Sequence, residues 1–155
     1  MPCQICAFMK TQSPFYETEH WGVDLSPDQA YLGRCYVSLK RHCGDLAELT
    51  NAETLDFRDV VKTLETAIRQ SLHAEMFNWS CLMNDAYQEE TPETHVHWHV
   101  RPRYSSPRTI DCKRIGKITF EDPEFGHHYN RDRKRPVTSL VRDEIIKRIK
   151  EYLPS

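Results

Sequence analysis

Three histidines alternate with apolar residues in the segment ETHVHWHVRPR, residues 93–103. In a β-strand, successive side chains point to opposite faces of the sheet, so His95, His97 and His99 are expected to line one face. The two valines and the tryptophan between them would line the other face, as an apolar stripe suited to packing on a core. The sequence therefore predicts a strand with an apolar back and an imidazole front.

The bulk composition indicates one soluble globular domain. The chain has 155 residues, of which 39% are hydrophobic and 28% are charged, and its formal net charge is −2. That charge argues against non-specific electrostatic binding of DNA or RNA, so we expect no nucleic-acid partner. No apolar run approaches the roughly 20 residues that span a bilayer, and the N-terminus lacks the layout of a secretory signal. We therefore expect no membrane partner and a cytoplasmic location.

Further strands are predicted where aromatic and β-branched residues gather between polar segments. They lie at 30–39, 78–83 and 113–120. A polar loop, 84–93, separates the second of these from the histidine strand, which is expected to end near Tyr104. Strand, loop and strand of these lengths favour adjacent antiparallel strands.

Two helices are predicted from apolar residues that recur at helical spacing. The longer one covers 51–74, and Thr50 and Glu53 have capping-box spacing at its start. The second begins near Thr138, after a polar, turn-rich loop over 122–136. Neighbouring strands combined with separate helices are typical of the α+β class.

The residues alone leave three interpretations of the histidine row open. It is an inert surface strand, a three-histidine zinc site, or a site in which a neutral imidazole attacks phosphorus. Arg101 and Arg103 follow on the same face, where they would attract an anion and repel a bound zinc ion. Their charge favours phosphate chemistry without excluding the other two interpretations.

The segment HVHWHVRPR resembles the motif His-φ-His-φ-His-φ-φ (φ hydrophobic) of the histidine triad (HIT) superfamily of nucleotide hydrolases and transferases, although Arg101 fills one φ position. VSLKRH resembles that family's strand ending in Lys-x-His. NWSCLMN resembles the strand before the motif, and HWHVRPRY resembles the bacterial and archaeal branch ending in Pro-Arg-Tyr. The resemblance implies a HIT-like catalytic domain over 1–104, with an antiparallel sheet and one long helix. Residues 105–155 would form a C-terminal extension packed on the same domain.

The resemblance also implies roles for single residues. His97 would attack the α-phosphate of a nucleoside phosphoramidate or dinucleoside polyphosphate and form a nucleotidyl-histidine. The backbone carbonyl of His95 would fix its tautomer, and His99 would contact the phosphate or the leaving group. Asn84 would form a hydrogen bond near the ribose or phosphate. Family members usually form homodimers, so we expect a homodimer.

Three further residues are expected to bind substrate. Asp24, in DLSP, resembles a family aspartate that meets ribose, and Arg103 would attract the phosphate. Thr91 stands where many family members have a phosphate-bridging glutamine. The loop around it is acidic, with glutamates at positions 89, 90 and 93. They would weaken polyphosphate binding, select a cationic leaving group such as an amine, or simply face solvent.

A Cys-x-x-Cys pair, Cys3 and Cys6, has the spacing of half a zinc site. A redox pair and two unrelated thiols are the alternatives. Some members of the resembled family bind a structural zinc through such a pair, which implies His42 and His95 as the other two ligands. Cys43 is a possible substitute for its neighbour His42.

Two other functions remain open at this stage. One is a zinc-dependent hydrolase that uses the three histidines as ligands, and the other is a catalytically silent nucleotide-binding protein. A basic loop containing His127 and His128 either reaches the active site or faces solvent, and we favour solvent.

Overall fold

The computed structural model describes residues 3–155, and it has the predicted α+β class. Its main sheet is antiparallel, with the strand order β1 (Tyr16–Glu17), β2 (Trp21–Leu25), β3 (Cys35–Leu39), β5 (His97–Arg103) and β4 (Met76–Ser80). A separate hairpin pairs β6 (Arg108–Cys112) with β7 (Gly116–Phe120). The helices are α1 (Gln4–Thr11), α2 (Asn51–Leu72) and α3 (Ser139–Lys150), and the 3-10 helices are η1 (Leu46–Glu48) and η2 (Asn84–Gln88).

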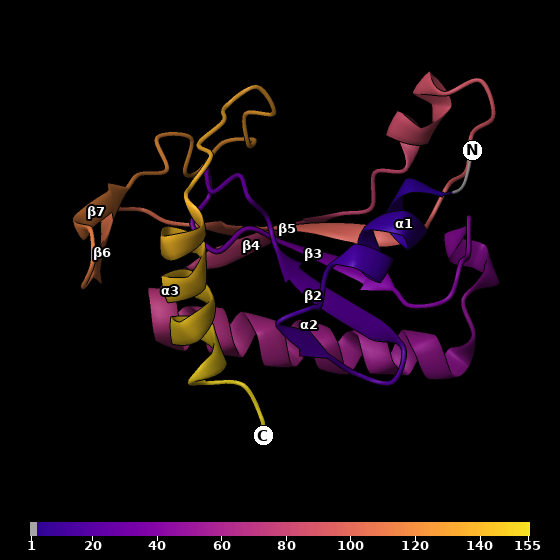
Figure 1. Cartoon of the computed structure of the whole chain (residues 1–155), viewed down its shortest axis with the longest axis horizontal. Helices are drawn as coiled ribbons and strands as arrows, with labels where there is room; N and C mark the ends of the chain where they lie inside the picture. The colour runs from indigo at the N-terminus through magenta and orange to yellow at the C-terminus, as the bar shows by residue number, and fades with distance from the viewer. Residues whose placement is uncertain (1–2) are drawn as a thin grey trace.

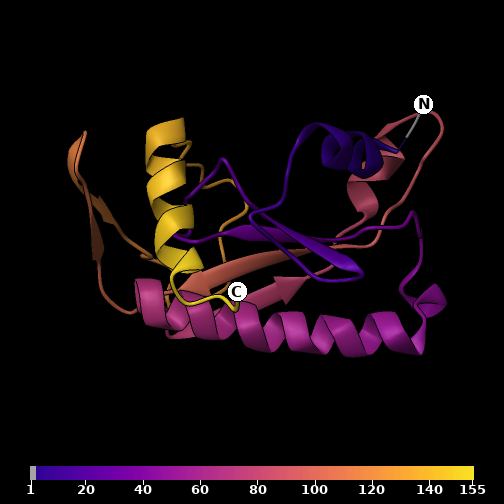
Figure 2. The same cartoon turned by 60° about the horizontal axis from the view of Figure 1, so that its bottom comes forward.

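Helix α2 covers one face of the main sheet along its length (Figure 2). It starts with the predicted capping box, in which the Glu53 backbone N–H donates to Thr50 Oγ1 (3.2 Å) and the Thr50 backbone N–H donates to Glu53 Oε2 (2.8 Å). It ends at Leu72, because His73 adopts a left-handed conformation (φ 61°). Its apolar stripe is buried against the sheet; these residues are Val60, Leu64, Ala67, Ile68 and Leu72.

The strand register separates the two faces of β5. Trp98 lies on the face toward α2, where its ring stacks on Phe57 at 5.0 Å and 21°, so its predicted place in the core is confirmed. His97 and His99 lie on the opposite face. His99 pairs with Tyr36 of β3. α1, η2 and the 121–137 loop lie on this same side of the sheet, away from α2 (Figure 1).

Three predicted strand boundaries were wrong. The strand expected over 30–39 begins only at Cys35, because Gly33 (φ 81°) and the Arg34 N–H to Tyr31 O bond form a turn before it. The strand expected over 78–83 is β4, which ends at Ser80. The strand expected over 113–120 begins at Gly116.

The sequence analysis also missed β2, β6 and α1. In β2, Trp21, Val23 and Leu25 alternate with Gly22 and Asp24, but the sequence analysis did not recognise this five-residue pattern as a strand. Helix α1 has eight residues and none is buried, so it carries only a weak apolar pattern.

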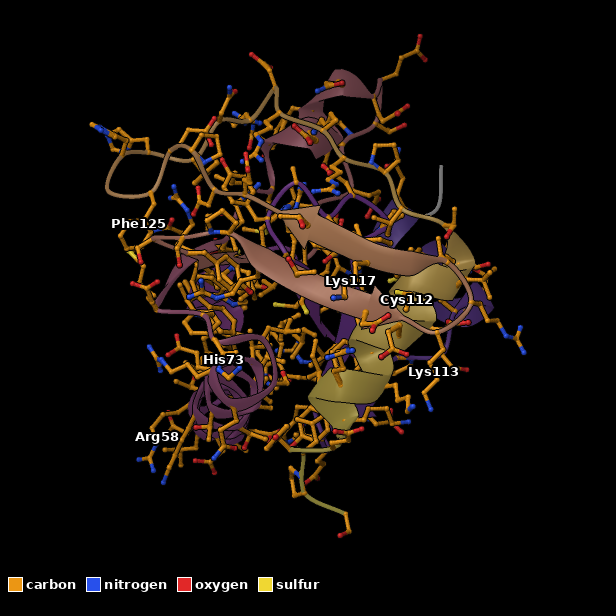
Figure 3. The ribbon with its side chains drawn as sticks, turned by 90° about the vertical axis from the view of Figure 1, so that its left-hand side faces the viewer. Arg58, His73, Cys112, Lys113, Lys117 and Phe125 are labelled. Atoms are coloured by element: carbon orange, nitrogen blue, oxygen red, sulfur yellow. The ribbon has the colours of Figure 1, made fainter. Side chains whose placement is uncertain are left out.

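The segment after Tyr104 packs on the same core. Val141, Ile145 and Ile149 of α3 are buried in the core cluster, and α3 contacts α2. The β6–β7 hairpin lies over α3 (Figure 3). Within residues 3–155, the structure has no helix that combines the length and apolar character needed to cross a membrane.

Candidate active site

His97 is held in one tautomer by its own strand. Its Nδ1 lies 2.8 Å from the backbone carbonyl oxygen of His95. A carbonyl oxygen can only accept, so Nδ1 carries the proton and Nε2 keeps its lone pair in the neutral ring. Nε2 lies 3.2 Å from Nε2 of His99, which therefore donates to it. This arrangement gives His97 an unprotonated nitrogen next to a hydrogen-bond donor.

His99 is a buried neutral imidazole. Burial, together with the nearby charges of His97 and Arg101, lowers its pKa to about 3. The Tyr36 and His99 rings pack nearly perpendicular to each other (83°), with ring centroids 5.2 Å apart. Its Nδ1 is buried and forms no hydrogen bond within residues 3–155. A neutral His99 can donate through Nε2 to only one acceptor at a time, either His97 or a bound substrate.

The ring nitrogens of His95 have partners other than His97 and His99. Its Nε2 donates to the backbone carbonyl oxygen of Leu39 at 2.8 Å, so its Nδ1 is unprotonated. That Nδ1 lies 3.4 Å from the Sγ atoms of both Cys3 and Cys6. Both ring nitrogens of His95 are thus engaged elsewhere. The three histidines of the row do not converge on one point, which disfavours a three-histidine metal site.

Cys3, Cys6, His42 and His95 form a compact cluster whose candidate ligand atoms all lie within 4.8 Å of one another. Cys6 Sγ lies 3.5 Å from His42 Nδ1. In a tetrahedral site with zinc–sulfur and zinc–nitrogen bonds of about 2.3 and 2.1 Å, a sulfur and a nitrogen ligand lie about 3.6 Å apart. The cluster therefore has the spacing of a Cys₂His₂ zinc site.

The surroundings of the cluster also fit a metal site. The Leu39 carbonyl orients His95, and the Glu93 carboxylate lies 3.5 Å from His42 Nε2, as carboxylates and carbonyls do behind metal-binding histidines. Burial raises the pKa of the Cys6 thiol, and the adjacent Cys3 raises it further. Cys43 does not join the cluster, because its thiol donates to the Asp45 carbonyl oxygen at 3.2 Å.

A cavity of about 330 Å³ lies between α1, η2 and the histidine strand. This is the size range of small-molecule sites. One part of its wall is apolar and consists of Ile5, Ala7, Leu82, Met83 and Ala86. His97 and His99 form another part of the wall, so the unprotonated nitrogen of His97 is next to a space that can hold a ligand.

Comparison with known proteins identifies solved structures that share this fold. No family model and no curated protein matches the sequence. Among solved structures, the chain is similar to a HIT family protein from Bacillus anthracis (27% identity, TM-score 0.56, covering 68% of this chain and 75% of that chain). It is also similar to a histidine triad protein from Sinorhizobium meliloti (15%, 0.68, 95% and 94%) and a zinc-bound histidine triad family protein from Mycobacterium smegmatis (20%, 0.62, 97% and 95%). The chain therefore has the fold of these histidine triad proteins.

The structure separates the two loop residues expected to bind substrate. Thr91 lines the cavity beside the triad. Asn84 does not line it, because it starts η2 and its side chain is exposed. Two of the three loop glutamates, Glu89 and Glu93, also line the cavity, and Glu89 accepts a hydrogen bond from Gln4 Nε2 (3.1 Å). The acidic character predicted for this loop is therefore present at the site.

Asp24 and Arg103 are both buried, with different surroundings. Asp24 pairs with Tyr36 across β2 and β3, forms no side-chain hydrogen bond within residues 3–155, and has a pKa raised by burial. Arg103 donates to Asp122 through Nε (2.7 Å) and Nη2 (3.1 Å). Arg103 is 1% exposed and lines neither cavity near the triad, and its contact with substrate stays a prediction.

A second cavity, of about 460 Å³, shares His99, Leu82 and Asp85 with the first. Its cationic residues, which the sequence analysis did not bring together, are Arg34, Arg101, Arg131 and Lys134. They come from three separate segments, so only the fold brings them together. His127 and His128 are exposed and line neither cavity.

Proposed function

We propose that this protein hydrolyses or transfers nucleotides at the α-phosphate through a covalent nucleotidyl-His97 intermediate. The observation that carries the proposal is the 2.8 Å contact between His97 Nδ1 and the His95 carbonyl oxygen. It fixes the proton on Nδ1 and leaves the lone pair of Nε2 beside the cavity. A neutral imidazole in this state is a competent nucleophile near neutral pH.

The reaction has two steps. His97 Nε2 attacks the α-phosphorus, a P–N bond forms, and the P–O or P–N bond to the leaving group breaks. Neutral His99 gives a hydrogen bond through Nε2 to a phosphate oxygen or to the leaving group, and an amine leaving group takes its proton from solvent. In the second step water or another acceptor attacks phosphorus and passes a proton to solvent, and the P–N electron pair returns to Nε2.

We assign the apolar wall near Ile5 and Leu82 to the nucleoside, and Thr91 to a phosphate oxygen. Asp24 and Asn84 stay predictions as nucleotide contacts, since neither lines the cavity. The expected homodimer and cytoplasmic location are also part of the proposal. β4 is an outer strand of the main sheet within residues 3–155, and an unpaired strand edge is a surface on which two copies can join.

We further propose that Cys3, Cys6, His42 and His95 bind a structural zinc ion. A site with four protein ligands leaves no position for a catalytic water, so the zinc would stabilise the fold only. It would tie α1 to the strand that carries His97. This role also gives His95 a purpose separate from the chemistry of its two neighbours.

The test measures AMP release from adenosine phosphoramidate and from a dinucleoside polyphosphate. Wild type should release AMP, and His97→Ala should lose at least about 10³-fold in rate, as expected when a covalent nucleophile is removed. His73→Asn is the matched control, because this exposed histidine lies at the C-terminal end of α2 (Figure 3) and asparagine tolerates its left-handed conformation. The control should retain wild-type turnover.

The intermediate provides a second readout. With α-³²P-labelled substrate, quenched wild type should carry acid-labile label, and His97→Ala should carry none. Turnover that survives in His97→Ala would refute the covalent mechanism. Nucleotide binding of equal affinity in both proteins, without turnover in either, would favour the silent binding protein.

A further inference from the structure

The second cavity differs in charge from the first. Four cationic residues line it, and we call Arg34, Arg101, Arg131 and Lys134 the arginine pocket. Two carboxylates, those of Asp85 and Asp132, also line it. The first cavity instead has Asp85, Glu89 and Glu93 and no lysine or arginine. The two sides of His99 therefore suit ligands of different charge.

Arg101 is a buried cation without a counter-ion. It is 5% exposed, and within residues 3–155 no carboxylate lies within ion-pair distance of it. Its Nη1 donates to Ser80 Oγ (3.3 Å), and its guanidinium lies 4.0 Å from the centre of the Tyr129 ring. Burying a charge without a paired charge is costly. An anion in the pocket would offset that cost.

Arg34 is a second buried cation of the arginine pocket. It is 7% exposed, and its Nη1 donates to Asp28 Oδ2 at 2.7 Å. Its Nε is buried and forms no hydrogen bond within the described residues. It also lies close enough to repel Arg101, whose pKa is lowered by burial and by this neighbour. Of the two buried guanidinium groups, only that of Arg34 is paired with a carboxylate, that of Asp28.

The 121–137 loop completes the pocket. It supplies Arg131, which is exposed and forms no ion pair in the described chain, and Lys134, which lies 3.8 Å from Asp28. Arg131 lines the same cavity as His99, and its charge contributes to the low pKa of His99. The loop lies on the side of the sheet that carries the histidines (Figure 1).

The strand geometry indicates which part of a substrate would reach the pocket. His97, His99 and Arg101 follow one another on one face of β5, and each step of two residues advances by about 6.6 Å. Phosphoryl transfer places the leaving group opposite the nucleophile. With His97 as nucleophile and His99 beside the leaving oxygen, Arg101 lies one step further along the same line.

We propose that the arginine pocket binds the phosphate groups of the leaving group. The preferred substrates are then dinucleoside polyphosphates or nucleoside polyphosphates, whose leaving groups carry several negative charges, rather than phosphoramidates. The assignment of the pocket to a leaving group rests on the proposed function, whereas the anion site itself does not. It also gives a role to Arg101, which fills a hydrophobic position of the triad motif.

The anion site is tested with inorganic tripolyphosphate, by titration calorimetry at low ionic strength. Wild type should bind it, and Arg131→Ala should bind about tenfold more weakly, the effect of one charge-assisted contact. Lys113→Ala is the control: it removes the same charge from an exposed site at the outer end of the β6–β7 hairpin (Figure 3) and should bind like wild type. Arg131→Lys should recover part of the affinity.

Arg101→Met adds a test that does not depend on the loop. Without tripolyphosphate its melting temperature should not fall below that of wild type, since a desolvated cation has been removed. Tripolyphosphate should then raise the melting temperature of wild type more than that of the variant. Absent binding to wild type, or equal affinity of wild type and Arg131→Ala, would overturn the anion site.

The assignment to the leaving group is tested by a ratio of kcat/KM values, for a dinucleoside polyphosphate over adenosine phosphoramidate. The ratio should fall about tenfold in Arg131→Ala and stay at the wild-type value in Lys113→Ala. A weaker tripolyphosphate affinity with an unchanged ratio would overturn the assignment. If neither substrate is turned over, the proposed function fails, and the tripolyphosphate titration still decides whether the anion site exists.

Discussion

At the scale of single residues, His99 combines burial with cationic neighbours. Its folded-state pKa is lowered to about 3 by burial, then by His97 and Arg101, whereas an exposed histidine titrates near 6.5. Below about pH 6.5 the unfolded chain therefore binds a proton at this position that the folded chain does not bind. The contribution of neutral His99 to stability is complete above that pH and is lost as the pH falls toward 3.

Urea unfolding of wild type and His99→Gln at several pH values checks this prediction. The difference in free energy of unfolding, wild type minus variant, should fall on acidification with a slope approaching about 1.4 kcal/mol per pH unit below pH 6. Taking the difference cancels the titration of groups that both proteins share. A difference that stays constant between pH 7.5 and 4.5 would show that His99 is not held neutral in the fold.

The sequence was sufficient to predict the positions of site residues that lie within a single strand. Alternation alone places His97 and His99 on one face of β5, and the register confirms that face. The same alternation placed Arg103 beside them, but its Nε and Nη2 donate to Asp122, which lies 19 residues later in the chain. Long-range pairing of this kind leaves no periodic signal in a sequence.

At the scale of elements, α1 depends on the cysteine–histidine cluster. None of its residues is buried, so apolar packing contributes little to its stability. Cys3 caps the helix, and Cys6 lies in its first turn, next to His42 and His95. With zinc bound at these four side chains, α1 would be fixed over the cavity beside His97.

We therefore expect the purified protein to contain about one zinc ion per chain by mass spectrometry of the metal. Cys6→Ser should lose most of that zinc and should be cleaved faster by trypsin at Lys10 within α1. Cys112→Ala is the control, since this cysteine lies in β6, outside the cluster, and it should keep its zinc. A full zinc content in Cys6→Ser would contradict the ligand assignment.

Elements with a strong periodic pattern were predictable, and those fixed by other parts of the fold were not. Helix α2 has both its capping box and its apolar stripe in the sequence. β2 alternates over only five residues and contains a single β-branched residue, Val23, so its signal in the sequence is weak. Gly33, with a φ of 81°, forms a turn, and β3 therefore starts five residues after the predicted position.

At the scale of the whole molecule, the Arg103–Asp122 pair joins the C-terminal segment to the triad strand. Both side chains are 1% exposed, and Asp122 also accepts a hydrogen bond from the Tyr104 backbone N–H (3.1 Å). Arg103 Nη1 donates in addition to Asn78 Oδ1 (2.8 Å) and to the His127 carbonyl oxygen (3.2 Å). One guanidinium therefore connects β4, β5 and the loop that supplies Arg131 to the arginine pocket.

Removing one partner of this pair should disturb stability and anion binding together. Asp122→Ala leaves a buried, unpaired guanidinium, and we expect a loss of about 3–5 kcal/mol in the free energy of unfolding. Glu121→Ala, which removes the neighbouring exposed carboxylate, should cost less than about 0.5 kcal/mol. Chemical denaturation measures both values.

The double variant Arg103→Met/Asp122→Leu distinguishes the effect of the buried charge pair on stability from its effect on the 121–137 loop. It removes both charges and keeps the apolar volume, so it should recover much of the stability lost in Asp122→Ala. It also removes the hydrogen bond from Arg103 to the His127 carbonyl, so the 121–137 loop should exchange its amide hydrogens faster than in wild type, and tripolyphosphate should bind more weakly. If both variants bind tripolyphosphate as tightly as wild type, the position of Arg131 does not depend on this buried pair, and the C-terminal segment and the triad strand are energetically independent.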